Sequence, residues 1–212
     1  MGKNSTYKFW DSLAGRYDGF ISKYAQKTYD QSLELMGQEL TASSKVLEIG
    51  TGTGLVAFAL ADKVHELKGI DYSPKMIEVA NNKLAKTAFN NIEFKVNCAT
   101  EIEYDNESFD IIIASNVFHL FPYPADVLTE AERLLVHGGK LILPTYCHGE
   151  NFKTLMLSYL TSLSGFKVES RWSVLQFSTF VEEQDFEIIK QEVIKDKFPM
   201  SFLVAKKKNN HG

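Results

Sequence analysis

The chain has 212 residues, 44% of them hydrophobic, which is enough for the core of one domain and argues against a second independent domain. Its formal net charge of −4 and its one short basic run, at 206–208, argue against a nucleic-acid partner, because binding to phosphates needs clustered Lys and Arg. Two cysteines, no apolar segment of membrane-spanning length and a polar start predict a cytoplasmic protein with no membrane span and no disulfide framework.

The first 40 residues carry apolar side chains at helical spacing and predict two helices. After them, strand and helix patterns alternate along the chain. The predicted strands are 45–49, 66–70, 92–96, 109–115 and 139–145. The predicted helices between and after them are 54–62, 74–88, 124–135 and 149–163. This alternation indicates parallel β-α-β units with helices on both faces of one sheet.

The last part of the chain departs from this alternation. Residues 173–184 have a helical pattern, and strand patterns follow at 186–194 and 201–205. A short segment containing Pro199 joins these two strands, so we expect an antiparallel hairpin at the edge of the sheet.

The most informative segment lies at the end of the first predicted strand. The apolar run from Val46 to Ile49 leads into Gly50, Gly52 and Gly54, which alternate with threonines. Glycine adopts backbone angles closed to other residues and has no side chain to block a ligand, and the next helix directs its N-terminal amides at that ligand. We therefore expect a nucleotide-like ligand at this turn.

Two carboxylates refine this expectation. Asp71 closes the second predicted strand, about 20 residues after the first glycine, where a carboxylate can accept hydrogen bonds from both hydroxyls of a ribose. Dinucleotide-binding turns favour a glycine where this chain has Leu55, and Glu48 adds a carboxylate beside the turn. An anion there suits a cationic ligand better than a pyrophosphate.

The segment 48–54 (Glu-x-Gly-x-Gly-x-Gly), followed by 69–76 (Gly-Ile-Asp-Tyr-Ser-Pro-x-Met), resembles the motifs of class I S-adenosylmethionine-dependent methyltransferases. The opening segment 9–18 is similar to that of the small-molecule group from ubiquinone and menaquinone biosynthesis. The resemblance implies the cofactor S-adenosyl-L-methionine, with S-adenosyl-L-homocysteine as its product. It also implies an α/β fold with a Rossmann-like, doubly wound sheet of seven mostly parallel strands, one antiparallel strand, helices on both faces and an N-terminal helical lid.

The resemblance implies a single methyltransferase domain, 1–212, with three parts. We expect residues 1–40 to form the N-terminal helical lid, 41–148 the cofactor-binding core, and 149–212 substrate-side helices and the C-terminal β-hairpin. The resemblance implies cofactor contacts in the loops after the first four strands. The expected contacts are Glu48, Gly50, Thr51, Gly52, Gly54, Asp71, Tyr72, Met76, Asn97, Cys98, Ala99 and Asn116.

One expected adenine contact departs from the family pattern. The family usually has an acidic residue where Cys98 stands, and a thiol accepts hydrogen bonds poorly. We expect backbone groups around Cys98 and Ala99, or the side chain of Asn97, to bind the adenine; a buried cysteine without ligand contact is the alternative. Tyr72 and Met76 either enclose the adenine ring or belong to the core.

The expected catalytic residues are His119 and Tyr17. His119 follows the fourth strand and is the expected base if the acceptor atom starts protonated, with a packed structural histidine as the alternative. Tyr17 belongs to the lid, which excludes water and orients the methyl group. Tyr146 and His148, at the end of the fifth strand, are either substrate contacts or ordinary polar loop residues. The metal-binding side chains of that loop have no second cluster to complete a site, so we expect no metal.

These features predict a methyltransferase that acts on a small, partly apolar molecule. A non-catalytic protein that only binds S-adenosylmethionine is one alternative. A nicotinamide-dependent oxidoreductase is another, although Leu55 and Glu48 argue against it. The acceptor atom and the oligomeric state stay open.

Overall fold

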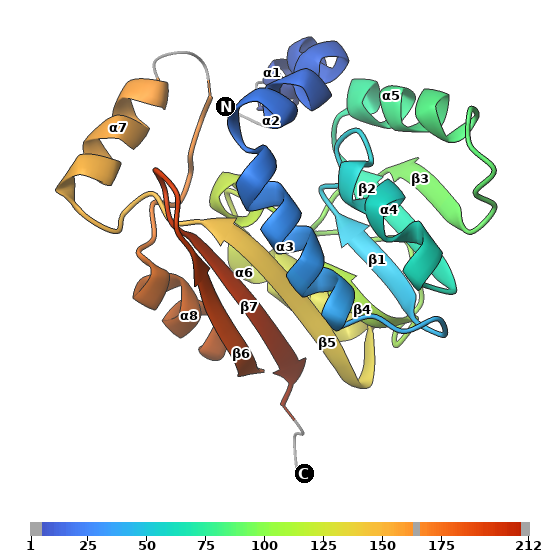
Figure 1. The fold of residues 1–212 in the computed structure, drawn as a ribbon. Coiled ribbons are helices and arrows are strands. Elements are labelled where there is room, and N and C mark those ends of the chain that lie inside the picture. The colour runs from blue at the N-terminus through green and yellow to red at the C-terminus, as the bar shows by residue number, and fades with distance from the viewer. Residues whose placement is uncertain (1–5, 163–165, 209–212) are drawn as a thin grey trace.

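The computed structural model describes residues 6–162 and 166–208 and contains a seven-stranded sheet in the order β3-β2-β1-β4-β5-β7-β6 (Figure 1). The strands are β1 (Lys45–Ile49), β2 (Glu66–Asp71), β3 (Ile92–Val96), β4 (Phe109–Ile113), β5 (Leu135–Tyr146), β6 (Phe186–Ile194) and β7 (Met200–Lys207). Strand β7 is antiparallel to β5 and β6, whereas the other pairs are parallel. The predicted Rossmann-like sheet with one antiparallel strand is therefore confirmed.

The α-helices are α1 (Thr6–Leu13), α2 (Tyr17–Tyr24), α3 (Gln26–Gln38), α4 (Leu55–Leu60), α5 (Pro74–Leu84), α6 (Pro124–Leu134), α7 (Phe152–Ser162) and α8 (Val174–Glu182). Three of them precede β1, where the apolar spacing predicts two. A 3₁₀ turn at Ala14–Arg16 separates α1 from α2, and Ala25, with φ −135° and ψ 4°, separates α2 from α3. The apolar spacing runs on through both breaks, so periodicity alone does not locate them.

Strand β5 also begins earlier than its pattern predicts, at Leu135 rather than 139. Leu135 pairs with Phe109 of β4, and regular pairing resumes at Lys140 with Ile111. The strand passes this irregularity at Gly138, whose φ is +75°. Glycine tolerates this angle, so the glycines that resemble a turn in sequence instead form a bulge within one long strand.

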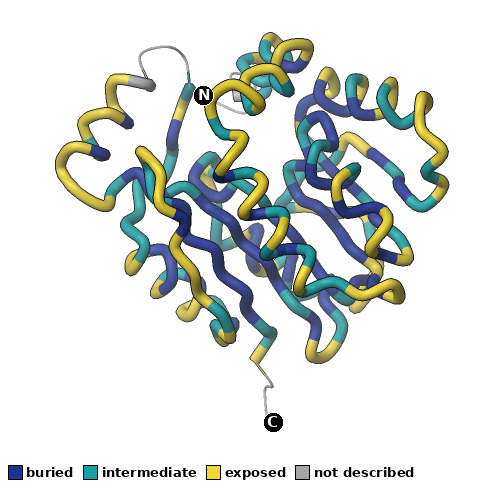
Figure 2. Tube along the Cα trace, in the orientation of Figure 1, coloured by how far each residue is buried: buried dark blue, intermediate teal, exposed yellow. Residues whose placement is uncertain are grey.

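Helices cover both faces of the sheet, and the central strands are buried on both sides (Figure 2). In β1, Val46 packs among apolar residues of α3, α4 and α5, whereas the next residue, Leu47, packs among those of α6 and α8. Successive side chains of a strand point to opposite faces, so a strand buried on both sides is apolar at nearly every position. This burial explains the continuous apolar runs of β1 and β4.

The order in which strands are added to the sheet reverses at β1: β2 and β3 lie on one side of it, and β4 and β5 lie on the other. In open α/β sheets the loops on either side of such a reversal part at the carboxyl ends of the strands and leave a crevice for ligands. Helices α1 and α2 lie over this edge (Figure 1). None of the helices within 6–162 and 166–208 is both long enough and apolar enough to cross a membrane.

Candidate cofactor and acceptor site

The turn after β1 has the open backbone that its glycines predict. Gly50, Gly52 and Gly54 have φ of +72°, +55° and +80°. A Cβ at Gly50 would lie 2.5 Å from Cγ1 of Val117, so packing excludes a side chain there. At Gly52 the nearest atom to such a Cβ is Cε1 of Tyr17, at 3.9 Å. The turn is thus tightly packed at its start and less crowded where it faces the lid.

Asp71 ends β2 beside this turn. Its Oδ2 accepts a hydrogen bond from the backbone N–H of Gly52 at 2.9 Å, and its Oδ1 accepts one from the N–H of Ser73 at 2.8 Å. Burial raises the pKa of Asp71 above its ordinary value, and these two backbone bonds oppose that rise. Each carboxylate oxygen keeps acceptor capacity for one more donor, such as a ribose hydroxyl.

Glu48 is a buried carboxylate on the other side of the turn. Its Oε2 accepts a hydrogen bond from Oγ1 of Thr51 at 2.6 Å. Burial raises the pKa of Glu48 to about 8, and the nearby charge of Asp71 adds to the rise, while the Thr51 bond opposes it. A cation beside Glu48 would favour its ionised form, so the site is electrostatically suited to a positively charged ligand.

Two aspartates of the lid tie it to the core. Oγ of Ser73, at the start of α5, donates to Oδ1 of Asp11 at 2.5 Å. Thr53 of the glycine turn donates to Oδ1 of Asp18 at 2.5 Å, and Nζ of Lys83 lies 2.9 Å from Oδ2. Both aspartates belong to the opening segment 9–18 that resembles a lid, but the sequence pattern alone does not indicate these bonds.

Tyr17 lies beside the glycine turn. Its ring packs edge-on against Trp10 of α1, with the ring centroids 6.2 Å apart. Burial raises the pKa of Tyr17 above its ordinary value, and the charges of Asp71 and Glu48 raise it further. The hydroxyl therefore stays protonated at neutral pH and can donate a hydrogen bond.

Tyr72 and Met76, the two residues expected around the adenine ring, have different environments. Tyr72 is exposed, and its ring lies edge-on to Tyr7 of the lid at 5.8 Å between centroids. Met76 is buried in the first turn of α5, where its N–H donates to Oγ of Ser73. The burial of Met76 fits the alternative that it is a core residue, whereas the exposed ring of Tyr72 is accessible to a ligand.

The segment after β3 lies next to Asp71. The N–H of Asn97 donates to the backbone oxygen of Asp71 at 3.0 Å. The side-chain oxygen of Asn97 accepts from the N–H of Cys98 at 2.7 Å, and the Cys98 thiol lies 3.3 Å from the hydroxyl of Thr100. Ala99 packs against the core cluster on the α6 and α8 face. The side chains of Asn97 and Cys98 are thus engaged within their own loop.

Asn116 follows β4 in a left-handed conformation, with φ +56°. Its N–H donates to the backbone oxygen of Pro144 at 2.7 Å. Its side-chain oxygen is buried and has no hydrogen-bond partner within the described parts of the chain. A strained residue with an unpartnered acceptor is typical of a binding site, and an ammonium group is a suitable donor.

His119 and His148 form a buried pair at the ends of β4 and β5. Their ring centroids lie 5.0 Å apart, and the ring of Phe198 lies 4.3 Å from that of His148. Within 6–162 and 166–208, Nδ1 of His119 and both ring nitrogens of His148 have no hydrogen-bond partner. Burial lowers the pKa of His119 well below its ordinary value, and burial with the charge of Arg171 lowers that of His148 to about 4. Both rings are therefore neutral at pH 7.

Aromatic side chains connect this pair to the lid. Phe166 lies 6.2 Å from His119 and 5.9 Å from Trp10, between ring centroids. Phe166 lies in the segment 151–171, whose Leu, Met, Tyr and Phe side chains predict either one wall of an apolar acceptor pocket or a cover of the sheet, whereas no periodic pattern or motif singles out Phe198. Phe166 and Phe198 thus pack against the two histidines, and Phe166 connects them to Trp10 of α1.

Tyr146 ends β5 and has a different set of neighbours. Burial raises its pKa to about 12, the charge of Asp196 adds to the rise, and a hydrogen bond with Thr28 opposes it. Thr28 of α3 also donates to Oδ2 of Asp196 at 2.6 Å. Tyr146 is therefore joined to α3, whereas His148 packs against His119.

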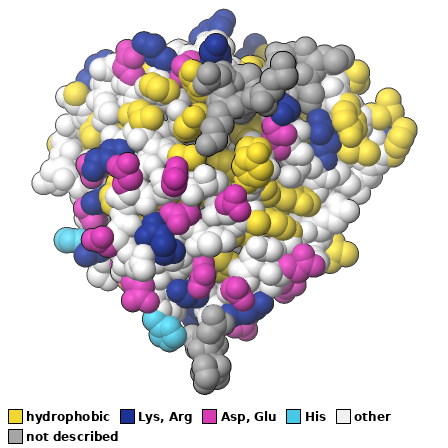
Figure 3. All heavy atoms as spheres, turned by 180° about the vertical axis from the view of Figure 1, so that it is seen from behind, with side chains coloured by type: hydrophobic (Ala, Val, Ile, Leu, Met, Phe, Trp, Pro, Cys, Tyr) yellow, Lys and Arg dark blue, Asp and Glu magenta, His cyan; other side chains and the backbone are white. Residues whose placement is uncertain are grey.

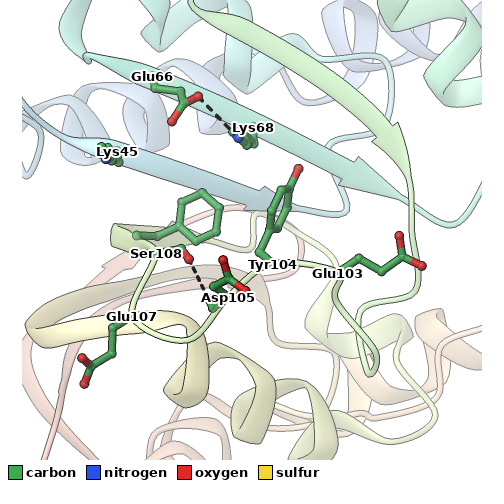
Figure 4. Close-up of a pocket in the computed structure, with 9 residues that line it drawn as sticks. Lys45, Glu66, Lys68, Glu103, Tyr104, Asp105, Glu107 and Ser108 are labelled. Atoms are coloured by element: carbon green, nitrogen blue, oxygen red, sulfur yellow. Dashed lines mark hydrogen bonds and ion pairs between the residues drawn. The ribbon is translucent and has the colours of Figure 1, made fainter.

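A hollow of about 620 Å³ lies at the other end of the strands, where β1, β2 and β4 begin (Figure 4). It is lined by Lys45, Glu66 and Phe109, which begin β1, β2 and β4, and Figure 4 shows Lys68 directed at Glu66. Ligands of such sheets bind at the carboxyl ends, so we assign this hollow no role in the site. Within the described residues, no group of three or more His, Cys, Asp and Glu side chains could hold a metal ion.

Comparisons with known proteins agree with this geometry. A family model described as a methyltransferase domain matches residues 40–197. The demethylmenaquinone methyltransferase of Thermotoga maritima is 30% identical over 151 residues, which cover 66% of this chain and 61% of that protein. The uncharacterized methyltransferase YcgJ of Bacillus subtilis is 31% identical over 114 residues, which cover 54% and 45%. The matched regions thus span 45% to 61% of these relatives' lengths.

Among solved structures, the methyltransferase in a complex with the Haloferax volcanii Trm112 methyltransferase activator has a TM-score of 0.83 and 20% identity, covering 98% of this chain and 100% of that one. The crystal structure of YcgJ has a TM-score of 0.72 and 20% identity, covering 85% and 100%. These likenesses show the fold. Because the family model covers most of the sequence, from before β1 to beyond β6, the chain belongs to the methyltransferase domain family, which confirms its resemblance to class I S-adenosylmethionine-dependent methyltransferases.

Proposed function

We propose that the protein binds S-adenosylmethionine at the carboxyl ends of β1 and β2 and transfers its methyl group to a small, partly apolar acceptor. The observation that carries this proposal is the carboxylate of Asp71, oriented by the backbone amides of Gly52 and Ser73. Glu48 is the second carboxylate beside the turn. A cation beside Glu48 favours its ionised form, so the ammonium and sulfonium of S-adenosylmethionine suit this site better than the pyrophosphate of a nicotinamide dinucleotide.

The residues present fit the parts of this cofactor. Asp71 would accept hydrogen bonds from the ribose hydroxyls, and the unpartnered side-chain oxygen of Asn116 would accept one from the ammonium group. Tyr72 and backbone groups around Cys98 would contact the adenine. When bound, the cofactor supplies an electrophilic methyl group on its sulfonium. The lid, tied down by Asp11 and Asp18, would exclude water from that group.

The acceptor would lie among His119, His148, Phe166 and Trp10. Methyl transfer is an in-line displacement whose barrier falls mainly through positioning, and aromatic walls orient a flat or apolar acceptor. A neutral His119 can take the proton that leaves the attacking atom. The name of the Thermotoga maritima relative, a demethylmenaquinone methyltransferase, also favours a small-molecule acceptor.

Calorimetric titration tests the cofactor assignment. We expect S-adenosylhomocysteine to bind the purified protein with micromolar affinity and NAD not to bind. Binding of NAD alone would overturn the proposal and favour redox chemistry. Formation of S-adenosylhomocysteine from S-adenosylmethionine, measured with a panel of small acceptors, then separates an enzyme from a protein that only binds the cofactor.

A further inference from the structure

Helix α7 buries polar side chains and exposes apolar ones, the reverse of an ordinary surface helix. Its small polar side chains, Thr154 and Ser158, are buried at 7% and 0% exposure. Its large apolar side chains are exposed: Phe152 75%, Met156 50%, Leu157 39%, Tyr159 57% and Leu160 58%. Surface helices normally bury the apolar side and expose the polar one. An exposed group of large apolar side chains is typical of a surface that binds a partner.

The two buried polar side chains of α7 both make hydrogen bonds. Nε of Arg171 donates to Oγ of Ser158 at 3.0 Å. The hydroxyl of Thr154 donates to the backbone oxygen of Asn151 at 2.8 Å, and the side-chain oxygen of Asn151 accepts from the N–H of Thr154 at 3.0 Å. The guanidinium of Arg171 also lies over the ring of Tyr159, at 4.2 Å. Ser158 is thus bonded to another segment of the protein, Thr154 is bonded within the first turn of the helix, and the apolar side faces outward.

Helix α7 lies at the same end of the molecule as α2, which also exposes aromatic side chains (Figure 1). It projects from the molecule at the carboxyl-end side of the sheet, toward the same end as the lid (Figure 1). Viewed from behind, apolar side chains gather on the projecting rim (Figure 3). Helix α2 of the lid also exposes Phe20 and Tyr24, and Nζ of Lys23 lies 5.1 Å from the Tyr24 ring.

We propose that α7, together with the exposed end of α2, docks the protein onto the surface of a lipid bilayer. Helix α7 carries one charge, Lys153, and no acidic side chain. Interfacial helices bury a face of Trp, Phe and Leu side chains at the boundary between lipid headgroups and acyl chains, and α7 presents such a face with a single basic residue beside it. Aromatic rings such as Phe152 and Tyr159 are enriched at that depth of a membrane.

The size of the surface argues for a bilayer over a second copy of the chain. Helix α7 has 11 residues and is therefore about 16 Å long and about 10 Å wide. A stable protein–protein interface buries about 800 Å² on each partner, several times the area of this face. A bilayer needs no complementary shape and accepts a single short helix to a depth of about 5–10 Å. This inference is independent of the proposed methyl transfer, because α7 contributes no residue to the cofactor turn.

Vesicle flotation tests the proposal with the full chain. We expect binding to phosphatidylcholine vesicles with or without phosphatidylglycerol, and little loss at high salt, because the apolar side chains dominate. The double variant Met156→Ser/Leu160→Ser should lower the partition coefficient by about tenfold or more, since each exposed side chain loses apolar burial. The matched control is Leu175→Ser, which removes an equally large side chain, 73% exposed, from α8. It should bind vesicles as the parent protein does.

Circular dichroism and the melting temperature establish that both variants are folded. No binding of the parent protein to either vesicle would overturn the proposal, as would equal losses in the α7 variant and the control. A dimer in solution that the α7 variant disrupts, without vesicle binding, would assign the surface to a second copy instead. Titration with S-adenosylhomocysteine should be unchanged in the α7 variant, which keeps this test separate from that of the proposed function.

Discussion

Oδ2 of Asp71 lies 2.9 Å from the backbone nitrogen of Gly52, so the end of β2 is joined directly to the glycine turn after β1. The bond explains why a carboxylate and a glycine are both needed there. Gly52 has φ +55°, which directs its N–H at the carboxylate, and its missing side chain leaves room beside Tyr17. The two residues form one unit, in which the backbone orients the side chain that would bind the ribose.

Replacing Asp71 tests this unit. We expect Asp71→Ala to weaken binding of S-adenosylhomocysteine by about 1.5–3 kcal/mol, the range for hydrogen bonds to a charged group. Calorimetric titration measures the change. Asp62→Ala, an exposed carboxylate after α4, is the control and should bind normally. Unchanged affinity in a folded Asp71→Ala protein would refute the ribose assignment.

Replacing His119 tests the proton acceptor. We expect His119→Ala to lower the methyl-transfer rate by about 10²–10⁴-fold, the usual contribution of a general base, while cofactor affinity stays nearly intact. The rate is followed as formation of S-adenosylhomocysteine with a saturating acceptor. His65→Ala, at an exposed position, should leave the rate unchanged. A normal rate in His119→Ala would make His119 a structural residue.

The raised pKa of Glu48 predicts a particular dependence of stability on pH. Its folded pKa of about 8 exceeds its ordinary value of 4.5, so the folded protein holds this proton more tightly than the unfolded chain does. The stabilisation is therefore complete below about 4.5 and is lost as the pH rises through about 8. By 1.4 kcal/mol per pKa unit, the loss is of the order of 3–5 kcal/mol.

Urea unfolding of the ligand-free protein between pH 4.5 and 8.5 measures this loss. The variant Glu48→Gln should show a flatter profile, because a neutral amide has no proton to lose. Carboxylates far from the turn contribute equally to both proteins, so the difference between the two profiles reports Glu48 together with its interaction with Asp71. Identical slopes would mean that Glu48 ionises normally in the folded protein.

Removing Asp18 tests the attachment of the lid. Asp18→Ala loses the hydrogen bond from Thr53 and the ion pair with Lys83. The ion pair is partly exposed and contributes little, so we expect the global stability to fall by only about 1 kcal/mol. Hydrogen exchange should accelerate in α2, the helix that carries Asp18. The control Asp30→Ala removes an exposed contact with Gln26 within α3 and should leave exchange in α2 unchanged. Equal exchange in both variants would mean that Asp18 does not hold the lid.

The geometry of the glycine turn and of the end of β2 was predictable because its requirements are local. Positive φ at Gly50 and Gly52 needs glycine, a buried central strand needs apolar side chains on both faces, and Asp71 stands at the end of the next strand. Each of these is visible in a short stretch of sequence. The same holds for the alternation of strands and helices, which predicted the parallel sheet and its final antiparallel hairpin.

Contacts between distant segments were decided by the tertiary structure alone. Phe198 meets His148 because β7, which follows it, pairs with β5. Phe166 meets His119 because the N–H groups of Glu169 and Ser170 donate to the backbone oxygen of His119. The partners of Asp11 and Asp18 lie in the glycine turn and α5, far along the chain. For α7, the sequence determined that apolar side chains outnumber polar ones, but periodicity does not say which side meets the protein. In the folded chain Thr154 and Ser158 face inward, where Ser158 accepts a hydrogen bond from Arg171, and the large apolar side chains are exposed.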